Sequence, residues 1–251
     1  MPPAVLITGA ARRIGKVLAR HFAEAGWHVV IHHGFSHGEA DALATSLPSA
    51  EVVQCDLTDP AAAEAMVEEL AVRLPDWRCL INNAAVFNED GVSRTDPAVF
   101  AEAIAVNLAS PVRMAQAFLR SAKSGGGRRV IHFTDMKVAN PNPDFFSYTL
   151  AKNALAASVK TLAMGPWDSS DRVYGLAPGA MLPSHDQVDE EHELSGRMNL
   201  LQRLTDPQEL AEAALFLSEG WLASGDSLFI DSGQHLLSQP RDVLYLARGL
   251  S

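Results

Sequence analysis

Short apolar runs recur along the whole chain, separated by intervals that are long enough for at least one helix. Most of these runs are continuous and do not alternate with polar residues. This pattern is typical of strands that are covered on both faces of a parallel sheet. The runs, which we predict to be strands, cover residues 4–7, 29–31, 52–55, 80–81, 130–133, 173–176 and 228–230.

Helical patterns fill the intervals. The first is an amphipathic pattern over residues 17–25 that ends at Gly26. Asp-Pro pairs at residues 59–60 and 206–207 indicate helix starts, with Asp as the N-cap and Pro in the first turn. Strands that alternate with helices imply an α/β fold with a parallel sheet and a ligand site at the carboxyl ends of the strands. Further helices are predicted over residues 61–73, 100–119, 145–164 and 207–217.

The composition is that of a soluble globular protein. The 251 residues are 47% hydrophobic, and the sequence shows no charged leader and no 18-residue apolar run. We expect a cytoplasmic protein without a membrane segment, folded as one domain over residues 1–251. The formal net charge of −10 argues against a nucleic-acid partner, because phosphate binding needs a basic patch. Cys55 and Cys79 lie in or beside apolar runs, so we expect buried free thiols.

A small-residue turn joins the first strand to the first helix. In this context the backbone N–H groups of the turn and the helix N-terminus can face the pyrophosphate of a dinucleotide. We therefore predict a cofactor-binding loop that contains Gly9, Arg12, Arg13, Ile14 and Gly15.

The end of the second strand indicates which nicotinamide cofactor is bound. An acidic residue there would bind the ribose 2′-OH of NAD, but the sequence is neutral or basic and Glu39 comes too late. The fork of Arg12 or Arg13 suits a 2′-phosphate, unless both arginines are simply solvated. We predict that the chain binds NADP. The other contacts to the phosphate are expected from Ser36 and from either His32 or His33.

The ends of later strands add candidate ligand contacts. Asp56, beside Leu57, either accepts a hydrogen bond from the adenine amino group or stabilises a turn. A Pro178-Gly179 turn follows the sixth strand at the same edge. Phe87 lies just beyond the fourth strand and either covers a flat ring or is anchored in the core. The residues that follow the fourth strand and suggest close approach of a ligand to the backbone are Asn83, Ala84 and Ala85.

Tyr148 and Lys152 lie four residues apart in a predicted helix, and therefore on one face. A fixed ammonium beside a phenol lowers the phenol pKa from about 10. Asp135, at the end of the preceding strand, would raise that pKa if it were ionised. It could be kept protonated by burial and act as an acid, accept from a substrate N–H, or merely orient Tyr148. Asn107 lies in an otherwise apolar helix and either has a structural partner or is catalytic.

Two segments near the carboxyl terminus complete the picture. Residues 180–200, which include His185 and His192, are polar and are predicted to form a mobile substrate loop. The spacing of their side chains does not match a metal site. The tail, residues 234–251, is expected to pack on a neighbouring subunit.

The order and spacing of these residues resemble the short-chain dehydrogenase/reductase family from end to end. The resemblance implies a single-domain, Rossmann-like, doubly wound fold with a seven-stranded parallel sheet. It also implies hydride transfer from a nicotinamide, with Tyr148 as proton donor, Lys152 holding the ribose, and Asn107 helping to keep a relay water near Lys152. Such enzymes are commonly homotetramers or homodimers. The matching residues are Thr8, Gly9, Gly15, Asp56, Asn82, Asn83, Ala84, Ala85, Asn107, Tyr148, Lys152, Pro178 and Gly179.

Departures from the general family pattern resemble its pteridine reductase and dihydromonapterin reductase branch. Arg13 replaces a glycine of the phosphate loop, and Asp135 replaces the usual serine thirteen residues before the tyrosine. The branch also has an aromatic residue at the position of Phe87, which sandwiches the pterin against the nicotinamide. Two residues differ from the branch: Ala85 replaces a serine and Phe35 replaces a basic residue.

Three functions fit these features. The first is an NADPH-dependent reductase of a dihydropterin, of the dihydromonapterin or dihydrobiopterin type, with weak dihydrofolate activity. Reduction of the C=N bond of a dihydropterin needs a hydride at carbon and a proton at nitrogen. Asp135 and Tyr148 together fit that need. The second is an NADPH-dependent carbonyl reductase acting on a 3-oxoacyl or sugar ketone. The third is a non-catalytic dinucleotide-binding sensor, against which the intact pair of Tyr148 and Lys152 argues.

Overall fold

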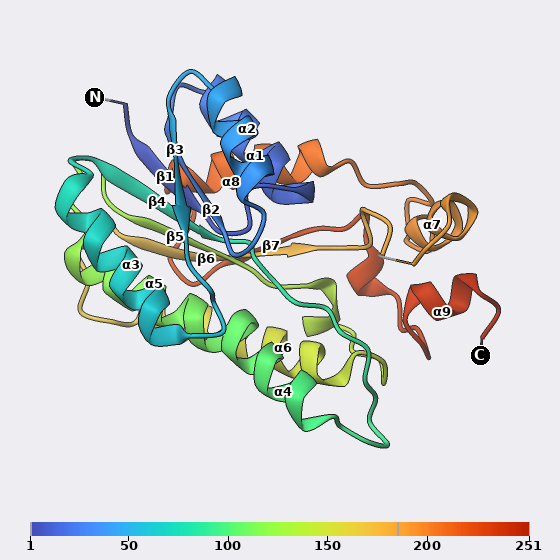
Figure 1. The fold of residues 1–251 in the computed structure, drawn as a ribbon. Helices are drawn as coiled ribbons and strands as arrows, with labels where there is room; N and C mark the ends of the chain where they lie inside the picture. The colour runs from blue at the N-terminus through green and yellow to red at the C-terminus, as the bar shows by residue number, and fades with distance from the viewer. Residues whose placement is uncertain (1, 185, 251) are drawn as a thin grey trace.

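The computed structural model describes residues 2–184 and 186–250, in which seven strands form one sheet. The strands are β1 Ala4–Ile7, β2 His28–His33, β3 Ala50–Gln54, β4 Trp77–Asn82, β5 Arg129–Phe133, β6 Arg172–Pro178 and β7 Ser227–Ile230. Their order is β3-β2-β1-β4-β5-β6-β7, and all neighbouring pairs are parallel (Figure 1). The predicted seven-stranded parallel sheet is confirmed, although β4 begins three residues earlier than the apolar run at residues 80–81.

Helices cover both faces of this sheet. They are α1 Arg13–Glu24, α2 His37–Ser46, α3 Pro60–Arg73, α4 Pro97–Ile104, α5 Ser110–Ser121, α6 Phe146–Ala163, α7 Asp189–Gly196, α8 Pro207–Ser218 and α9 Val243–Ala247. One face carries α1 packed on α8, and the other carries α3 packed on α5, with α4 and α6 in the same layer (Figure 1). Successive strand side chains point to opposite faces. Leu6 therefore packs beneath α3 and α5, whereas Val5 and Ile7 pack beneath α1 and α8.

Local signals set the helix starts. The side chain of Asp59 accepts hydrogen bonds from the N–H groups of Ala61 and Ala62 at the start of α3. Asp206 forms a capping box with Glu209 at the start of α8. Both predicted N-caps are confirmed.

The helix predicted over residues 100–119 begins earlier and is interrupted. Between α4 and α5 lies a π-helical turn, Ala105–Ala109, which carries Asn107. The whole helical stretch Pro97–Ser121 is long and apolar enough to cross a membrane by length and composition alone. Its parts pack on α3 and α6, so some of that apolar surface belongs to the core of the fold.

The polar segment and the tail each contain a short helix. Residues 180–200 contain α7, and His185 of this segment lies outside the described residues. The tail contains α9, which packs on α7 of the same chain. The expected packing of the tail on a neighbouring subunit stays a prediction. Cys55 and Cys79 are free and buried, as predicted.

The strand order reverses between β1 and β4, which are neighbours in the sheet. At such a switch point the connections leave in opposite directions and open a crevice at the carboxyl ends of the strands. The loop after β1, Asn83 after β4 and Asp135 after β5 all lie at this edge. The topology thus gathers the predicted ligand contacts in one place.

Candidate active site

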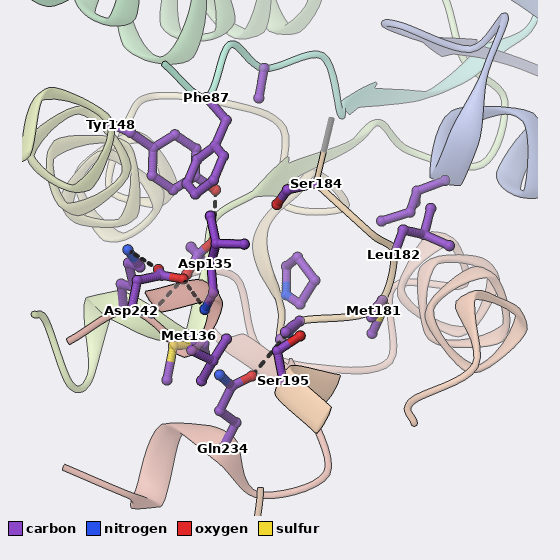
Figure 2. A pocket seen from close by; sticks show the side chains of 18 of the residues that line it. Phe87, Asp135, Met136, Tyr148, Met181, Leu182, Ser184, Ser195, Gln234 and Asp242 are labelled. Atoms are coloured by element: carbon purple, nitrogen blue, oxygen red, sulfur yellow. Dashed lines mark hydrogen bonds and ion pairs between the residues drawn. The ribbon is translucent and has the colours of Figure 1, made fainter. Parts of the chain in front are cut away.

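A cavity of about 280 Å³ lies at this edge of the sheet (Figure 2). Its wall combines the phosphate loop, the ends of β4, β5 and β6, one face of α6, the polar segment and part of the tail. Residues far apart in the sequence therefore meet around one space. The predicted site residues that line it are Arg13, Ile14, Asn83, Ala85, Phe87, Asp135, Tyr148, Lys152, Pro178 and Gly179.

Asp135 and Tyr148 form a direct hydrogen-bonded pair. The Tyr148 hydroxyl donates to Oδ2 of Asp135 at 2.6 Å, and the backbone N–H of Lys137 donates to Oδ1 at 2.9 Å. Burial raises the pKa of the Asp135 carboxyl, and the ammonium charge of Lys137 opposes that rise. A carboxyl group in this setting holds a proton more readily than an exposed aspartate does.

The pKa of the Tyr148 phenol is raised well above its ordinary value, because burial disfavours the phenolate and Asp135 adds negative charge beside it. The net shift is therefore opposite to the one expected from Lys152 alone, and it has the direction expected from the charge of Asp135. Tyr148 keeps its proton, which is the form that a proton donor requires.

Lys152 lies one helical turn after Tyr148, with its Nζ 5.6 Å from the centre of the phenol ring. Its ammonium donates to the carbonyl oxygen of Phe133 at 2.6 Å. Burial lowers its pKa to about 8, and the Asp135 carboxyl partly offsets this effect. An ammonium has three N–H donors, so this contact leaves capacity for a second acceptor.

Phe87 stands at the cavity wall in contact with two other aromatic rings. Its ring meets Tyr148 edge-on, with centroids 4.7 Å apart (Figure 2). It also stacks on Phe145, with centroids 3.9 Å apart. Phe145 in turn stacks on Tyr245 of the tail at 5.8 Å. Phe87 is anchored in a small apolar cluster and also lines the cavity. It therefore has features of both predicted alternatives, the core anchor and the ring beside a ligand.

The phosphate loop is shaped by close approaches that exclude side chains. A Cβ added to Gly15 would lie 2.2 Å from the carbonyl oxygen of Gly9. Gly9 itself has a φ of 64°, in the left-handed region that favours glycine. The hydroxyl of Thr8 accepts from the backbone N–H groups of Asn83 and Ala84, both at 3.0 Å, and ties the loop to the end of β4. The backbone is thereby held for a ligand to approach closely.

Arg13 occupies a glycine position of this loop with a φ of 51°. A side chain in the left-handed region costs about 1–2 kcal/mol, which explains why the general family pattern has glycine there. The guanidinium donates to the carbonyl oxygen of Pro183 at 2.8 Å, so it connects the phosphate loop to the polar segment.

The two histidines at the end of β2 differ in what they can bind. Both ring nitrogens of His32 are engaged, with the Gly9 N–H at 3.2 Å and the Cys55 carbonyl at 3.0 Å. Burial lowers its pKa to about 4, so it is neutral. The prediction of His32 as a phosphate contact is therefore corrected, because the ring has a structural role. Within residues 2–184 and 186–250, neither ring nitrogen of His33 has a hydrogen-bond partner, and Ser36 lies nearby at the start of α2.

Glu39 is closer to this end of the site than its sequence position suggested. Its carboxylate forms an exposed ion pair with the guanidinium of Arg12. The interval from β2 to Glu39 is too long for the usual ribose contact, but the first turn of α2 brings it beside the loop. The Arg12 guanidinium is therefore exposed, but its charge is paired with the carboxylate of Glu39.

Two other predicted contacts have structural partners. Oδ1 of Asp56, beside Leu57, accepts from the backbone N–H of Thr58 at 2.9 Å, which is the turn-stabilising alternative. The side chain of Asn107 donates to and accepts from the backbone of Val86, both at 2.9 Å, and it is fully buried. The structural alternative is thus present for Asn107, and the relay water that the resemblance implies stays a prediction. Among the described residues, no group of three or more His, Cys, Asp or Glu side chains could hold a metal ion.

A family model described as Enoyl-(Acyl carrier protein) reductase matches residues 9–235, which is most of the chain. The chain belongs to the short-chain dehydrogenase/reductase family. Among curated members, the 7alpha-hydroxysteroid dehydrogenase of Escherichia coli (strain K12) is 30% identical, covering 91% of this chain and 92% of that enzyme.

Two solved structures from this family are similar in fold and sequence. The FolM alternative dihydrofolate reductase 1 of Brucella canis, complexed with NADP, is 34% identical, with a TM-score of 0.87 over 94% of this chain and 95% of that chain. The Brucella suis protein, also in complex with NADP, is 35% identical with the same TM-score, over 95% and 96%. Pteridine reductase 1 of Leishmania tarentolae is 24% identical over 93% of this chain and 96% of its own, and the dihydromonapterin reductase of Citrobacter koseri is 23% identical over 94% and 98%.

Sequence reasoning missed part of the cavity wall. Lys137, two residues after the predicted acid, lines the cavity together with Asp242 from the tail. The signal that was available is local: an aspartate followed by the apolar stretch at residues 243–247 marks a helix start. That pattern predicts α9 but not where it packs.

The lowered pKa values of two buried histidines should make the free energy of unfolding depend on pH. Burial lowers the pKa of His32 to about 4 and that of His132 to about 3, from 6.5. Between pH 6.5 and these values the unfolded chain binds protons that the folded chain does not, so the free energy of unfolding falls as pH falls, by about 3 kcal/mol for His32 and about 5 kcal/mol for His132. Urea titrations across this pH range should show a shallower loss for His132→Gln, whereas the exposed His37→Gln should match the unchanged protein.

Proposed function

We propose that this chain is an NADPH-dependent reductase of a dihydropterin, of the dihydromonapterin or dihydrobiopterin type, with weak dihydrofolate activity. The observation that carries the proposal is the Asp135 carboxyl 2.6 Å from the Tyr148 hydroxyl, in a cavity walled by Phe87. The Brucella neighbours support it, because they are described as alternative dihydrofolate reductases in complex with NADP. The pteridine and dihydromonapterin reductases support the same substrate class.

The hydrogen-bonded pair suits the reduction of a C=N bond. NADPH supplies the hydride to the ring carbon, and the ring nitrogen must gain a proton. Burial raises the pKa of both Asp135 and Tyr148, so the pair holds a proton more readily than exposed groups would and offers an acid beside the nitrogen. When the proton has moved, the remaining hydrogen bond stabilises the charge left on the pair. Phe87 adds an aromatic side chain to the cavity wall, which suits contact with a flat ring.

We propose that the cofactor lies along the phosphate loop and the end of β4. The excluded Cβ at Gly15 and the positive φ of Gly9 fit a backbone that must approach a pyrophosphate. Lys152 would hold the nicotinamide ribose with its remaining donors. The 2′-phosphate contacts would come from Arg12, His33 and Ser36, and the remaining proposed cofactor contacts are Arg13, Ile14, Asp56, Leu57, Asn83, Ala84, Ala85, Pro178 and Gly179.

Glu39→Gln is expected to tighten NADPH binding by about three- to tenfold at low salt, because it removes an anion that pairs with Arg12 and would repel the 2′-phosphate proposed to bind there. The Kd of NADH, which has no 2′-phosphate, should change less. Titration of the nucleotide fluorescence measures both constants. Asp41→Asn, on the same helix and paired with His37, is the matched control. Equal changes for NADPH and NADH would contradict this role of Glu39.

A carbonyl reductase is the second candidate, since the 7alpha-hydroxysteroid dehydrogenase at 30% identity acts in a different substrate class. Asp135 separates the two functions, because the general family pattern has a serine hydroxyl at this position, suited to polarising a ketone oxygen, and this chain has a carboxyl group instead.

NADPH oxidation with a panel of substrates tests the proposal. We expect turnover of dihydromonapterin and dihydrobiopterin, slow turnover of dihydrofolate, and little or none of 3-oxoacyl esters and sugar ketones. NADH should be the poorer cofactor. Turnover of ketones without any dihydropterin would refute the substrate class, and nucleotide binding without any turnover would favour a sensor.

We further propose a single domain over residues 1–251 that assembles as a homodimer or homotetramer in the cytoplasm, without a nucleic-acid or membrane partner. Phe216 of α8 and the neighbouring Trp221 form an edge-to-face pair at the surface, and the Trp221 side chain is 74% exposed. An exposed apolar pair next to the edge strand β7 is suited to contact with a second copy. The segment 180–200 is proposed to move as substrate enters.

A further inference from the structure

The carboxy-terminal segment 241–245 is fixed to the body of the protein by several contacts. Arg241 forms an ion pair with Asp144 at 2.9 Å, and the backbone N–H of Asp242 donates to the same carboxylate at 2.8 Å. The Tyr245 hydroxyl donates to Glu89 at 2.6 Å. These contacts hold the segment in place without the carboxylate of Asp242.

The Asp242 carboxylate lines the active-site cavity (Figure 2). It accepts from the Lys137 ammonium at 2.6 Å and from the backbone N–H of Leu244 at 3.0 Å. The side chains of Asp242 and Lys137 are 9% and 5% exposed. A carboxylate has about four acceptor positions, so these two bonds leave acceptor capacity at the cavity wall.

The Lys137 ammonium, in contrast, has used its donors. Besides Asp242 it donates to Oδ1 of Asn142 at 3.3 Å and to the carbonyl oxygen of Asp144 at 3.4 Å. It also lies over the ring of Phe145, 5.0 Å from its centre. Three donors and three acceptors leave this cation no direct hydrogen bond to a ligand. Its effect is to hold the neighbouring carboxylate in a fixed orientation.

We propose that Asp242 is a specificity-determining residue that accepts a hydrogen bond from a donor on the substrate away from the reacting bond, and that Lys137 is its positioning residue. This inference rests on the proposed function. A dihydropterin carries two kinds of donor with this chemistry: the N–H groups of its aminopyrimidine edge and the hydroxyls of its side chain. A simple ketone carries neither, and would leave the buried carboxylate without compensation for its lost water.

Asp242→Asn tests the proposal with little change in structure. Asparagine is also a favoured N-cap, so it can still accept from Leu244 and start α9. We expect KM for dihydromonapterin to rise about ten- to hundredfold, as for a lost hydrogen bond to a charged acceptor, with kcat within about twofold. The Kd of NADPH and the midpoint of urea unfolding, measured on the same variant, show whether it is folded.

The matched control is Arg241→Gln. It breaks the neighbouring ion pair of the same segment, but Arg241 is not among the described residues that line the cavity. It should lower stability without changing KM. Lys137→Met is the second variant, and it should raise KM in the same direction because the carboxylate loses its partner. Asp242→Glu should keep KM closer to that of the unchanged protein than Asp242→Ser does. That difference would show that an anion is required.

A substrate without side-chain hydroxyls, 6,7-dimethyl-7,8-dihydropterin, identifies the donor. If Asp242→Asn raises KM for this compound as well, the donor is the pyrimidine edge; if it does not, the donor is a side-chain hydroxyl. The proposal is overturned if Asp242→Asn leaves KM within twofold for dihydromonapterin while the unchanged protein turns it over. If the unchanged protein reduces no dihydropterin, the proposed function itself has failed.

Discussion

Tyr148→Phe is expected to lower kcat/KM for dihydropterin reduction by about a hundred- to ten-thousandfold, the range that a general acid contributes. The substitution removes the hydroxyl that donates to Asp135 at 2.6 Å and keeps the ring that packs against Phe87. Steady-state NADPH oxidation measures the loss. The Kd of NADPH should change little, because the phosphate loop and Lys152 are untouched.

The control for this variant is Tyr245→Phe. Tyr245 belongs to the same aromatic cluster through Phe145, and its hydroxyl is bound to Glu89 away from the reacting pair. It should retain kcat within a few fold. If Tyr148→Phe kept more than about a tenth of kcat, the proton would have to come from another group, and Asp135 alone would be the acid.

Asp135→Ser is expected to lower kcat for dihydropterins by at least about a hundredfold, since an alcohol cannot supply a proton as a carboxylic acid does. The same change should raise the turnover of simple ketones. It removes the carboxyl that raises the pKa of Tyr148, and it adds a hydroxyl that can polarise a carbonyl. The ratio of kcat/KM for dihydromonapterin to that for a 3-oxoacyl ester gives the result in one number.

Asp144→Asn is the matched control for the loss of a carboxylate near the cavity. Asp144 pairs with Arg241 and does not contact the Tyr148 hydroxyl. Asparagine at this position can still accept from the backbone N–H of Asp242, so the substitution should leave the substrate ratio unchanged. A dihydropterin activity that survives or improves in Asp135→Ser would show that the carboxyl only orients Tyr148, and would return the assignment to a carbonyl reductase.

Much of the fold could be predicted because its signals are local. A continuous apolar run such as residues 4–7 identifies a buried strand without knowledge of its neighbours. Asp59 and Asp206 mark helix starts through hydrogen bonds to N–H groups within three residues. The parallel order then follows from the alternation of strands and helices, which places Asp135 and the phosphate loop at one edge.

The errors concern the partners that side chains find across the fold. The sequence placed two histidines equally near the cofactor, but pairing of β2 with β3 brings the Cys55 carbonyl to His32 and leaves His33 as the candidate. Lys152 alone would lower the pKa of Tyr148, but the depth of burial, which no spacing reveals, reverses the direction. Glu39 reaches Arg12 only because α2 packs beside the loop.

The tail illustrates the same limit. Asp242 and Lys137 are separated by more than a hundred residues and pair at 2.6 Å inside the cavity wall. Nothing in either local sequence indicates that contact. Tertiary packing decides which partner a buried charge finds. The pair of Asp242 and Lys137, which we propose to set specificity, therefore could not be predicted from the sequence.

Transfer of deuterium from NADPH labelled at the nicotinamide C4 tests the central claim most directly. The unchanged protein is incubated with 7,8-dihydromonapterin, and the product is examined by mass spectrometry and NMR. We predict one deuterium on the ring carbon of the former C=N bond and a solvent-derived proton on the nitrogen. A pterin that gains no deuterium, while a ketone in the same mixture does, would contradict the account.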